Sequence, residues 1–106
     1  PKTNMNKNSK ENISRKEALE KMGKYAAMTL GNLAVVAQNQ EEIAKEGGLR
    51  PLVALLSSPF LSCAHYAARA LYRLAANKQN QVRIANEGAI FPLIKFIDLR
   101  VEAFVF

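Results

Sequence analysis

The sequence predicts an all-α fold in which helices stack as a solenoid. Laid over itself at an offset of 41 residues, the chain agrees at 15 positions, and the agreements run through every kind of residue. Apolar residues three and four apart within the matched stretches identify the repeating elements as helices. A period of about 40 to 47 residues is typical of helical units that each bury an apolar face against the next. The matched pairs are Tyr25/Tyr66, Ala26/Ala67, Ala27/Ala68, Leu30/Leu71, Leu33/Leu74, Ala34/Ala75, Gln38/Gln79, Asn39/Asn80, Gln40/Gln81, Ile43/Ile84, Ala44/Ala85, Glu46/Glu87, Gly47/Gly88, Pro51/Pro92 and Leu52/Leu93.

The composition fits one small, soluble helical domain. The 106 residues are 49% hydrophobic without any Trp, and no apolar run approaches the roughly 20 residues of a membrane span. A single cysteine excludes an internal disulfide and a multi-thiolate metal site, in agreement with a reducing compartment. No secretory signal is visible. Because the chain begins at Pro1, we expect a piece of a longer protein.

The net charge of +6 lies mostly in the N-terminal segment. Residues 1–24 carry seven Lys/Arg and three Glu, which gives +4, and residues 25–106 carry eight Lys/Arg and six Asp/Glu, which gives +2. The leader PKTNMNKNSK is rich in Asn and Lys and nearly free of apolar residues, so it cannot bury enough surface to offset the entropy of ordering. We expect disorder over residues 1–12.

A long first helix is predicted to begin at Ser14, which forms a capping box with Glu17. One apolar stripe then runs for about six turns. Gly23 and Gly31 lie inside this stretch, where each lowers helix propensity by about 1 kcal/mol relative to Ala, so we expect close helix packing there. The stripe consists of Leu19, Met22, Ala26, Leu30, Leu33 and Ala37.

Short helices are expected after each long one. Asn39 with Glu42 repeats the cap pattern, and Gly47 is placed to end the helix in a left-handed conformation. Asn80 and Gly88 occupy the same positions one period later. Pro51 and Pro92 each open a second short helix, because a missing N–H does no harm in the first turn.

A second long helix is expected after the turn Ser57-Ser58-Pro59. Its apolar stripe is Ala64, Ala67, Leu71 and Leu74, and it should end near Asn77. The repeating unit is thus short helix, short helix, long helix. The predicted buried core comprises Leu30, Ile43, Leu52, Leu71, Leu74 and Ile84.

The segments NQEEIAKEGGLRPLVALLSS, AARALYRLAAN and NQVRIANEGAIFPLIKFI resemble the armadillo repeat. The resemblance implies a right-handed α-solenoid of armadillo repeats over residues 13–106. Residues 13–37 would be the third helix of one repeat, 38–76 a complete repeat and 77–106 a partial one.

The resemblance also implies a partner-binding groove, because third helices of armadillo proteins line a concave surface that holds an extended peptide. Asn32 matches the asparagine that holds the peptide backbone in that family; the alternative is an exposed polar helix residue without a ligand. Arg73 stands at this position one period later, which departs from the family pattern. Arg69 and Arg73 are four residues apart, so they form either a contact for an acidic peptide or a solvated helix face. The predicted groove comprises Tyr25, Met28, Asn32, Tyr66, Arg69 and Arg73. Tyr25, Tyr66 and Tyr72 could present amphipathic surface to a partner, but aromatic residues at helical spacing are more often packed, and the repeat of Tyr25 at Tyr66 favours packing.

The predicted function is a non-enzymatic scaffold or adaptor that binds an acidic extended peptide or a partner protein inside the cell, in the cytoplasm or nucleus. Cys63 and His65 are two residues apart on a helix and point away from each other, so neither catalysis nor a metal site is expected. No cofactor motif is present. One alternative is a nuclear transport receptor, although Met28 and Arg69 stand where importin-α-like proteins have Trp. Another is a nucleic-acid or phosphoinositide binder that uses the basic leader.

Apolar residues at both ends of the array predict self-association of this chain. A closed symmetric dimer, exchange of the first helix and head-to-tail stacking would each cover these surfaces. The residues are Leu19, Met22, Tyr25, Leu99, Val101, Phe104, Val105 and Phe106.

Overall fold

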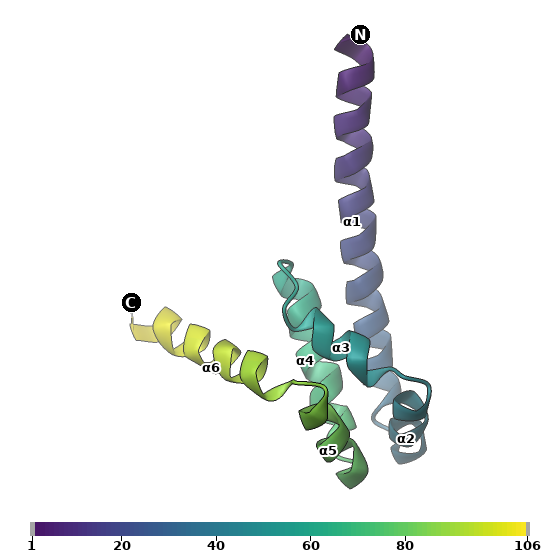
Figure 1. Ribbon diagram of the computed structural model, residues 1–106, viewed down its shortest axis with the longest axis vertical. Helices are drawn as coiled ribbons and strands as arrows, with labels where there is room; N and C mark the ends of the chain where they lie inside the picture. Colours follow the sequence, from purple (N-terminus) through teal and green to yellow (C-terminus); the bar gives the residue numbers. More distant parts are fainter. Residues whose placement is uncertain (1, 106) are drawn as a thin grey trace.

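In a computed structural model the backbone is described for residues 2–105 and the side chains for residues 14–104. Over this range the chain is all-helical, as predicted; α2 to α5 pack together with the C-terminal part of α1, whereas α6 projects away from them (Figure 1). The short, short, long order appears as α2, α3 and α4, and α5 begins the next unit. The prediction of a second short helix at Pro92 is wrong, because α6 runs for 16 residues without a glycine or a further proline to end it. The right-handedness of the solenoid stays a prediction. The helices are α1 (Lys2–Leu33), α2 (Ala37–Lys45), α3 (Leu49–Leu55), α4 (Leu61–Leu74), α5 (Lys78–Asn86) and α6 (Ile90–Val105).

The first helix is longer than the sequence predicts. It extends to Lys2 and so begins before the predicted cap at Ser14. Adding residues to an existing helix needs no new nucleus, and the residues before Ser14 include no glycine and, after Pro1, no proline. The disorder expected over residues 1–12 stays a prediction. The side chains of residues 1–13 lie outside the described part.

The buried face of α1 is not the predicted stripe. Leu19, Met22 and Leu33 are exposed, and of the predicted residues only Leu30 packs partly against the core. Ala27 and Gly31 are buried instead, on the side where α1 packs against α4, and so is Ala34, the first residue after the helix. The face that turns inward is the one with the small residues.

Close approach of α1 and α4 explains this choice and confirms the packing expected at the glycines. A Cβ atom on Gly31 would lie 3.4 Å from the Cα of Ala70, so the helix backbones nearly touch there. A Cβ on Gly23 would lie 3.6 Å from the Sγ of Cys63. Helix axes come this near only where small residues face each other, because bulky side chains hold axes apart. We call Gly23, Ala27, Gly31 and Ala34 the small-residue stripe.

The caps of the short helices differ from the prediction. Val36 is the N-cap of α2 and makes no side-chain cap hydrogen bond, and Asn39 lies inside that helix. At α5 the cap is Asn77, whose side chain accepts a hydrogen bond from the backbone N–H of Asn80. Asn39 and Asn80 use their amides to donate to the carbonyl oxygens of Leu33 and Leu74, at the end of the preceding long helix. They connect helices instead of capping them.

Hydrogen bonds repeat at the same 41-residue offset as the sequence. The bonds from Asn39 to Leu33 and from Asn80 to Leu74 are 3.0 and 3.1 Å long. The Gln40 amide donates to the Ala34 carbonyl oxygen at 2.7 Å, and Gln81 donates to Ala75 at 2.9 Å. The two units therefore share polar architecture as well as apolar packing.

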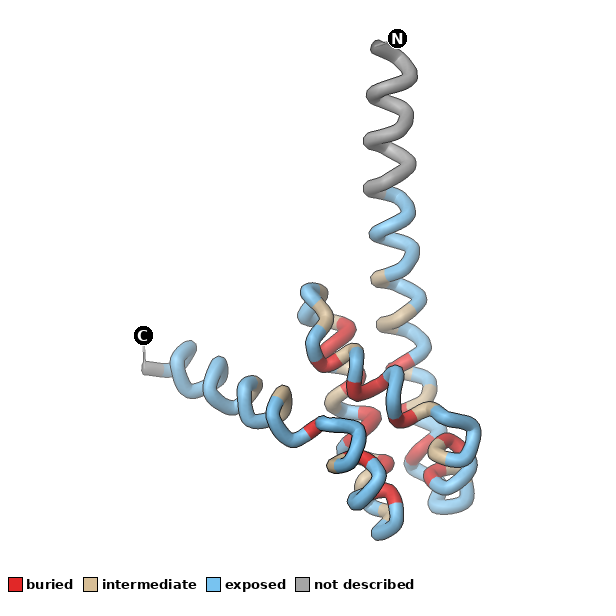
Figure 2. Tube along the Cα trace, viewed as in Figure 1, coloured by how far each residue is buried: buried red, intermediate tan, exposed pale blue. Residues whose placement is uncertain are grey.

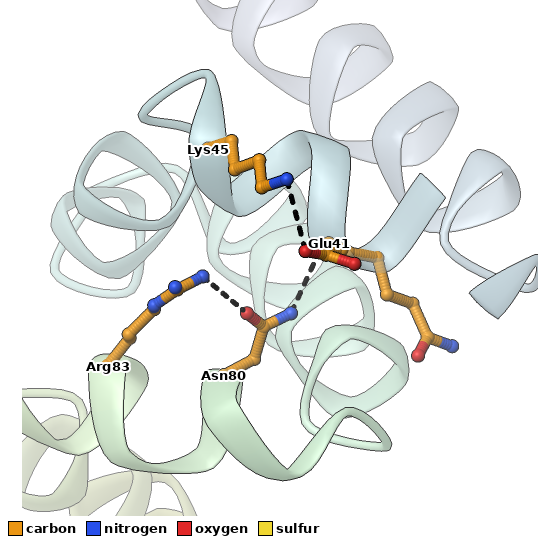
Figure 3. Close-up of polar contacts among 5 residues, drawn as sticks. Glu41, Lys45, Asn80 and Arg83 are labelled. Carbon is orange, nitrogen blue, oxygen red and sulfur yellow. Dashed lines mark hydrogen bonds and ion pairs between the residues drawn. The ribbon is translucent and has the colours of Figure 1, made fainter. Parts of the chain in front are cut away.

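One further hydrogen bond joins the two units. Asn80, which is fully buried, donates to the carbonyl oxygen of Gln40 on α2 at 2.9 Å. In Figure 3 its amide lies between α5 and α2, with Arg83 close to its oxygen. The ion pair of Lys45 with Glu41 lies nearby on α2. Asn80 thus ties the second repeat to the first.

The core forms where α4 meets its neighbours. Ile43, Leu52, Leu71, Leu74 and Ile84 are buried, which confirms five of the six predicted core residues. The sixth, Leu30, is partly buried against the same cluster. Figure 2 shows the buried positions gathered at the junction of the helices, whereas most of residues 14–26 of α1 and most of α6 are exposed. Within the described residues, no helix is long and apolar enough to cross a membrane.

Gly47 and Gly88 confirm the predicted left-handed helix ends, with φ angles of 83° and 88°. Replacing either glycine with Ala is expected to lower the free energy of unfolding by about 1 kcal/mol, because a Cβ disfavours this conformation. Gly23→Ala is the control. Its Cβ would make ordinary contacts within an α-helix, so the gain in helix propensity of up to about 1 kcal/mol should appear as stabilisation. Urea denaturation would measure all three variants, and equal stability of Gly47→Ala and the parent chain would contradict the assignment.

Candidate functional site

The predicted groove residues occupy equivalent positions on α1 and α4, two helices that pack side by side. The offset of 41 pairs Tyr25 with Tyr66, Met28 with Arg69 and Asn32 with Arg73. Tyr25, Asn32 and Arg69 are exposed, whereas Met28, Tyr66 and Arg73 are partly buried. Each of the six side chains is therefore at least partly accessible.

The structure brings Asn32 and Arg73 into direct contact. The Nη1 of Arg73 donates to the Asn32 Oδ1 at 3.0 Å and to the carbonyl oxygen of Gly31 at 2.9 Å. The guanidinium thus spans from α4 to the last turn of α1. This bridge links the third helices of the two successive units.

The bridge leaves a surface that can donate but hardly accept hydrogen bonds. The Asn32 oxygen is already used by Arg73, so its side chain offers mainly the two N–H donors of its amide. The guanidinium of Arg73 has five N–H donors and no acceptor, and Nη1 supplies the donors used in the bridge. A ligand for this surface must therefore bring acceptors such as carbonyl or carboxylate oxygens.

Arg69 adds a second cation one helical turn before Arg73. A spacing of four residues places the two side chains on one face of α4. The ion pairs found among residues 14–104 join Lys45 to Glu41 and Arg50 to Glu87, and both lie away from this face. The positive charge of the pair is thus not neutralised by a carboxylate within the described residues.

An open apolar depression lies beside the bridge. Its walls come from the end of α1, from α2 and from the last turn of α4, and Arg73 is part of its rim. Tyr72 and Val35 line it and are 80% and 65% exposed, although neither belongs to the predicted set. Tyr72 is, however, one of the three tyrosines that the sequence offers as possible partner surface. The lining residues are Ala34, Val35, Gln40, Tyr72, Arg73, Ala75 and Ala76.

The two tyrosines of the predicted set play different parts. Tyr66 packs partly against the core and meets the His65 ring edge-on at a centroid distance of 4.8 Å. Tyr25 is 56% exposed, and the Nζ of Lys24 lies 5.5 Å from its ring centroid. Tyr25 therefore presents accessible aromatic surface, and Tyr66 supports the position of α4.

The cysteine and histidine are held apart, as predicted. Cys63 is buried, and its thiol donates to the carbonyl oxygen of Glu20 at 3.2 Å, across the contact between α4 and α1. His65 is exposed on the same helix. No group of three or more His, Cys, Asp or Glu side chains that could hold a metal ion occurs among the residues searched.

Residues 37–76 match the Armadillo/beta-catenin-like repeat, a range that begins at α2 and ends just after α4. No curated protein and no solved structure matched the sequence.

Proposed function

Taking residues 37–76 as an armadillo-type repeat, we propose that this chain is a protein-interaction scaffold whose surface on α1 and α4 binds an extended acidic peptide. The observation that carries the proposal is the bridge from Arg73 to Asn32. It places the exposed polar groups of two successive third helices within contact of each other. A chain lying across the two helices would meet both groups at once.

The preference for acidic ligands follows from charge and from hydrogen-bond character. Arg69 and Arg73 supply two positive charges, and the free groups of Asn32 are donors because its oxygen accepts from Arg73. Hydrogen bonds from guanidinium groups to carboxylates are charge-assisted and stronger than neutral ones. A basic peptide would meet repulsion here and would find few acceptors.

The preference for an extended chain follows from the remaining features of the surface. Backbone carbonyl oxygens of an extended segment are free to accept from an amide such as that of Asn32. The depression beside Tyr72 offers apolar surface for one side chain of the ligand. We further propose that the interaction takes place inside the cell, in the cytoplasm or the nucleus, which the free thiol of Cys63 supports.

The double substitution Arg69→Glu/Arg73→Glu is expected to weaken binding of a glutamate-rich peptide at least tenfold, or about 1.4 kcal/mol. Binding to the parent chain should also weaken as salt rises, because exposed charges are screened over about 8 to 10 Å. The control Lys78→Glu/Lys95→Glu makes the same change in net charge on α5 and α6. Fluorescence anisotropy with a labelled peptide would measure both. If both double variants lost the same amount of affinity, the loss would be due to net charge alone, which would contradict a binding site on α1 and α4.

A second substitution separates the amide donors from the arginines. Asn32→Asp keeps an oxygen for Arg73 but removes both N–H donors and adds a negative charge. Peptide binding should therefore fall although the bridge to α4 remains. Retention of the parent affinity would show that Asn32 does not contact the ligand.

We also propose that the chain self-associates. Large apolar side chains are exposed at both ends of the stack, among them Met22 and Leu33 on α1 and Ile97 and Phe104 on α6. Contact between chains would remove this surface from water, which is favourable by about 25 cal/mol per Å².

A further inference from the structure

The side of α1 that faces away from α4 is the repeat-equivalent of a surface that is buried inside the molecule. On α4, Cys63 and Ala70 face the small-residue stripe of α1. Shifted back by 41 residues, these two positions are Met22 and Thr29, which are exposed on α1. We call this side of α1 the outer face. It comprises Leu19, Met22, Tyr25, Ala26, Thr29 and Leu33, the equivalents of Phe60, Cys63, Tyr66, Ala67, Ala70 and Leu74.

A complementary surface lies on the other side of α4. A groove of about 420 Å³ runs between α4 and α6 and is lined mainly by apolar side chains. Ala64 and Ala68 in this groove are the repeat-equivalents of Gly23 and Ala27 in the small-residue stripe. The open side of α4, with Ala64 and Ala68, is therefore equivalent to the side of α1 that packs against α4. The lining residues are Leu61, Ala64, His65, Ala68, Phe96, Leu99, Arg100 and Ala103.

The hydrogen bonds of Asn39 and Asn80 show the same equivalence between one end of the stack and its interior. Asn80 on α5 donates to the carbonyl oxygen of Leu74, at the end of the preceding long helix, and to that of Gln40 on α2, the helix equivalent to α5 one period earlier. Asn39 makes the first of these bonds, to Leu33, and the second has no counterpart among the hydrogen bonds of the described residues. At the other end of the stack Gln81, the equivalent of Gln40, is exposed on α5. The Asn39 amide of one molecule could therefore donate to the Gln81 carbonyl oxygen of another, as Asn80 donates to Gln40 within one chain.

We propose that a second copy of this chain docks head to tail, with the outer face of its α1 in the groove between α4 and α6 of the first. The 41-residue register then continues from one chain into the next. Asn39 of the second copy donates to the Gln81 carbonyl oxygen of the first, as Asn80 donates to Gln40 within one chain. This inference rests on the proposed self-association and specifies its geometry.

Shape favours this arrangement over a symmetric pairing of two outer faces. The outer face carries large side chains such as Met22 and Leu33, whereas the α4 side of the groove presents the alanines at 64 and 68. Large side chains fit against small ones better than against other large ones, as α1 and α4 show within one chain.

One position departs from strict equivalence. Tyr72 stands on α4 where α1 has Gly31. Its bulk prevents the backbone approach seen between Gly31 and Ala70. The docked helix therefore lies farther from α4 at this end than α1 does. The contact near Leu61 and Ala64 is the closer one.

Complementation between two variants tests the geometry. The outer-face variant is Met22→Glu/Leu33→Glu and the groove variant is Leu61→Glu/Leu99→Glu; all four side chains are exposed, at 47% or more. A variant with Gln38→Glu/Ala54→Glu is the control for added negative charge at exposed positions. Circular dichroism would check that each variant folds. Sedimentation velocity would then follow association over a hundredfold range of concentration.

Head-to-tail docking predicts that the parent chain and the control form oligomers that grow with concentration. Each of the two test variants alone should stay monomeric, and an equimolar mixture should form a heterodimer and nothing larger, since one intact outer face meets one intact groove. A mixture that stays monomeric would overturn the proposed geometry. The geometry would also be overturned if the parent chain formed only dimers and the groove variant still associated. Self-association itself would then still hold. A monomeric parent chain would overturn both the proposed self-association and its head-to-tail geometry. The proposal that the chain binds an acidic peptide does not depend on any of these results.

Discussion

Replacing Leu71 with Ala is expected to lower the free energy of unfolding by about 2 to 5 kcal/mol. Leu71 lies on α4 at the centre of the core and is 2% exposed. The loss combines the transfer free energy of the removed carbons with a cavity that the neighbouring helices fill only in part. Small domains are stable by about 5 to 15 kcal/mol in total, so a large share of the stability would disappear.

Leu61→Ala provides the matched control, because it makes the same chemical change in the same helix at a position that is 77% exposed. Its effect should stay within about 0.5 kcal/mol, as for other surface substitutions. Urea denaturation followed by far-UV circular dichroism, at a concentration where the chain is monomeric, would measure both. Equal midpoints for the two variants would refute the assignment of Leu71 to the core.

Replacing Asn80 with Ala is expected to destabilise the fold by about 2 to 4 kcal/mol, since buried groups that lose a hydrogen-bond partner cost about 1 to 3 kcal/mol each. The amide of Asn80 is fully buried and donates to the carbonyl oxygens of Gln40 and Leu74. The first bond joins α5 to α2, so its loss also weakens the contact between the two units. Thermal and urea denaturation would give the change in stability.

Asn39→Ala is the natural comparison for Asn80→Ala. The two asparagines are equivalent in the repeat, but Asn39 is partly exposed and donates to the Leu33 carbonyl oxygen alone. Water can replace that bond, so a loss below about 1 kcal/mol is expected. If Asn39→Ala proved as destabilising as Asn80→Ala, the bond between the units would not be the source of the effect.

Much of the fold follows from the periodic sequence. The helical pattern and the 41-residue offset place Ile43, Leu52 and Leu74 in the core, and the structure buries them. The glycines after α2 and α5 also take their predicted conformation, because a left-handed residue at a helix end strongly favours glycine. These features depend on local chemistry that repeats.

The face of α1 could not be chosen from periodicity. The helix carries two candidate faces, one with Leu19 and Met22 and one with Ala27 and Gly31. Transfer free energy favours burying the larger side chains, but the contact with α4 is so close that small ones alone fit. Which face turns inward is set by the neighbouring helix and not by α1 itself.

The asparagines show a similar limit. Asn39 and Asn80 lie near helix starts and fit the pattern of N-caps, yet their amides reach back to the preceding helix. A side chain that can hydrogen-bond to several backbone groups does not reveal its partner by its position alone. The contact between Asn32 on α1 and Arg73 on α4 is easier to predict from the sequence. Asn32 and Arg73 hold the same position in consecutive units, and such positions lie side by side in a solenoid.

The small-residue stripe has a consequence for the curvature of the array. The distance between neighbouring helices depends on the side chains between them, and at Gly31 the backbones of α1 and α4 are nearly in contact. Small rotations between successive units accumulate along a solenoid into its overall bend. Buried residues at 27 and 31 therefore help to set how steeply the proposed binding surface curves. Bulkier side chains there would change the spacing of Asn32 and Arg73 without altering either one.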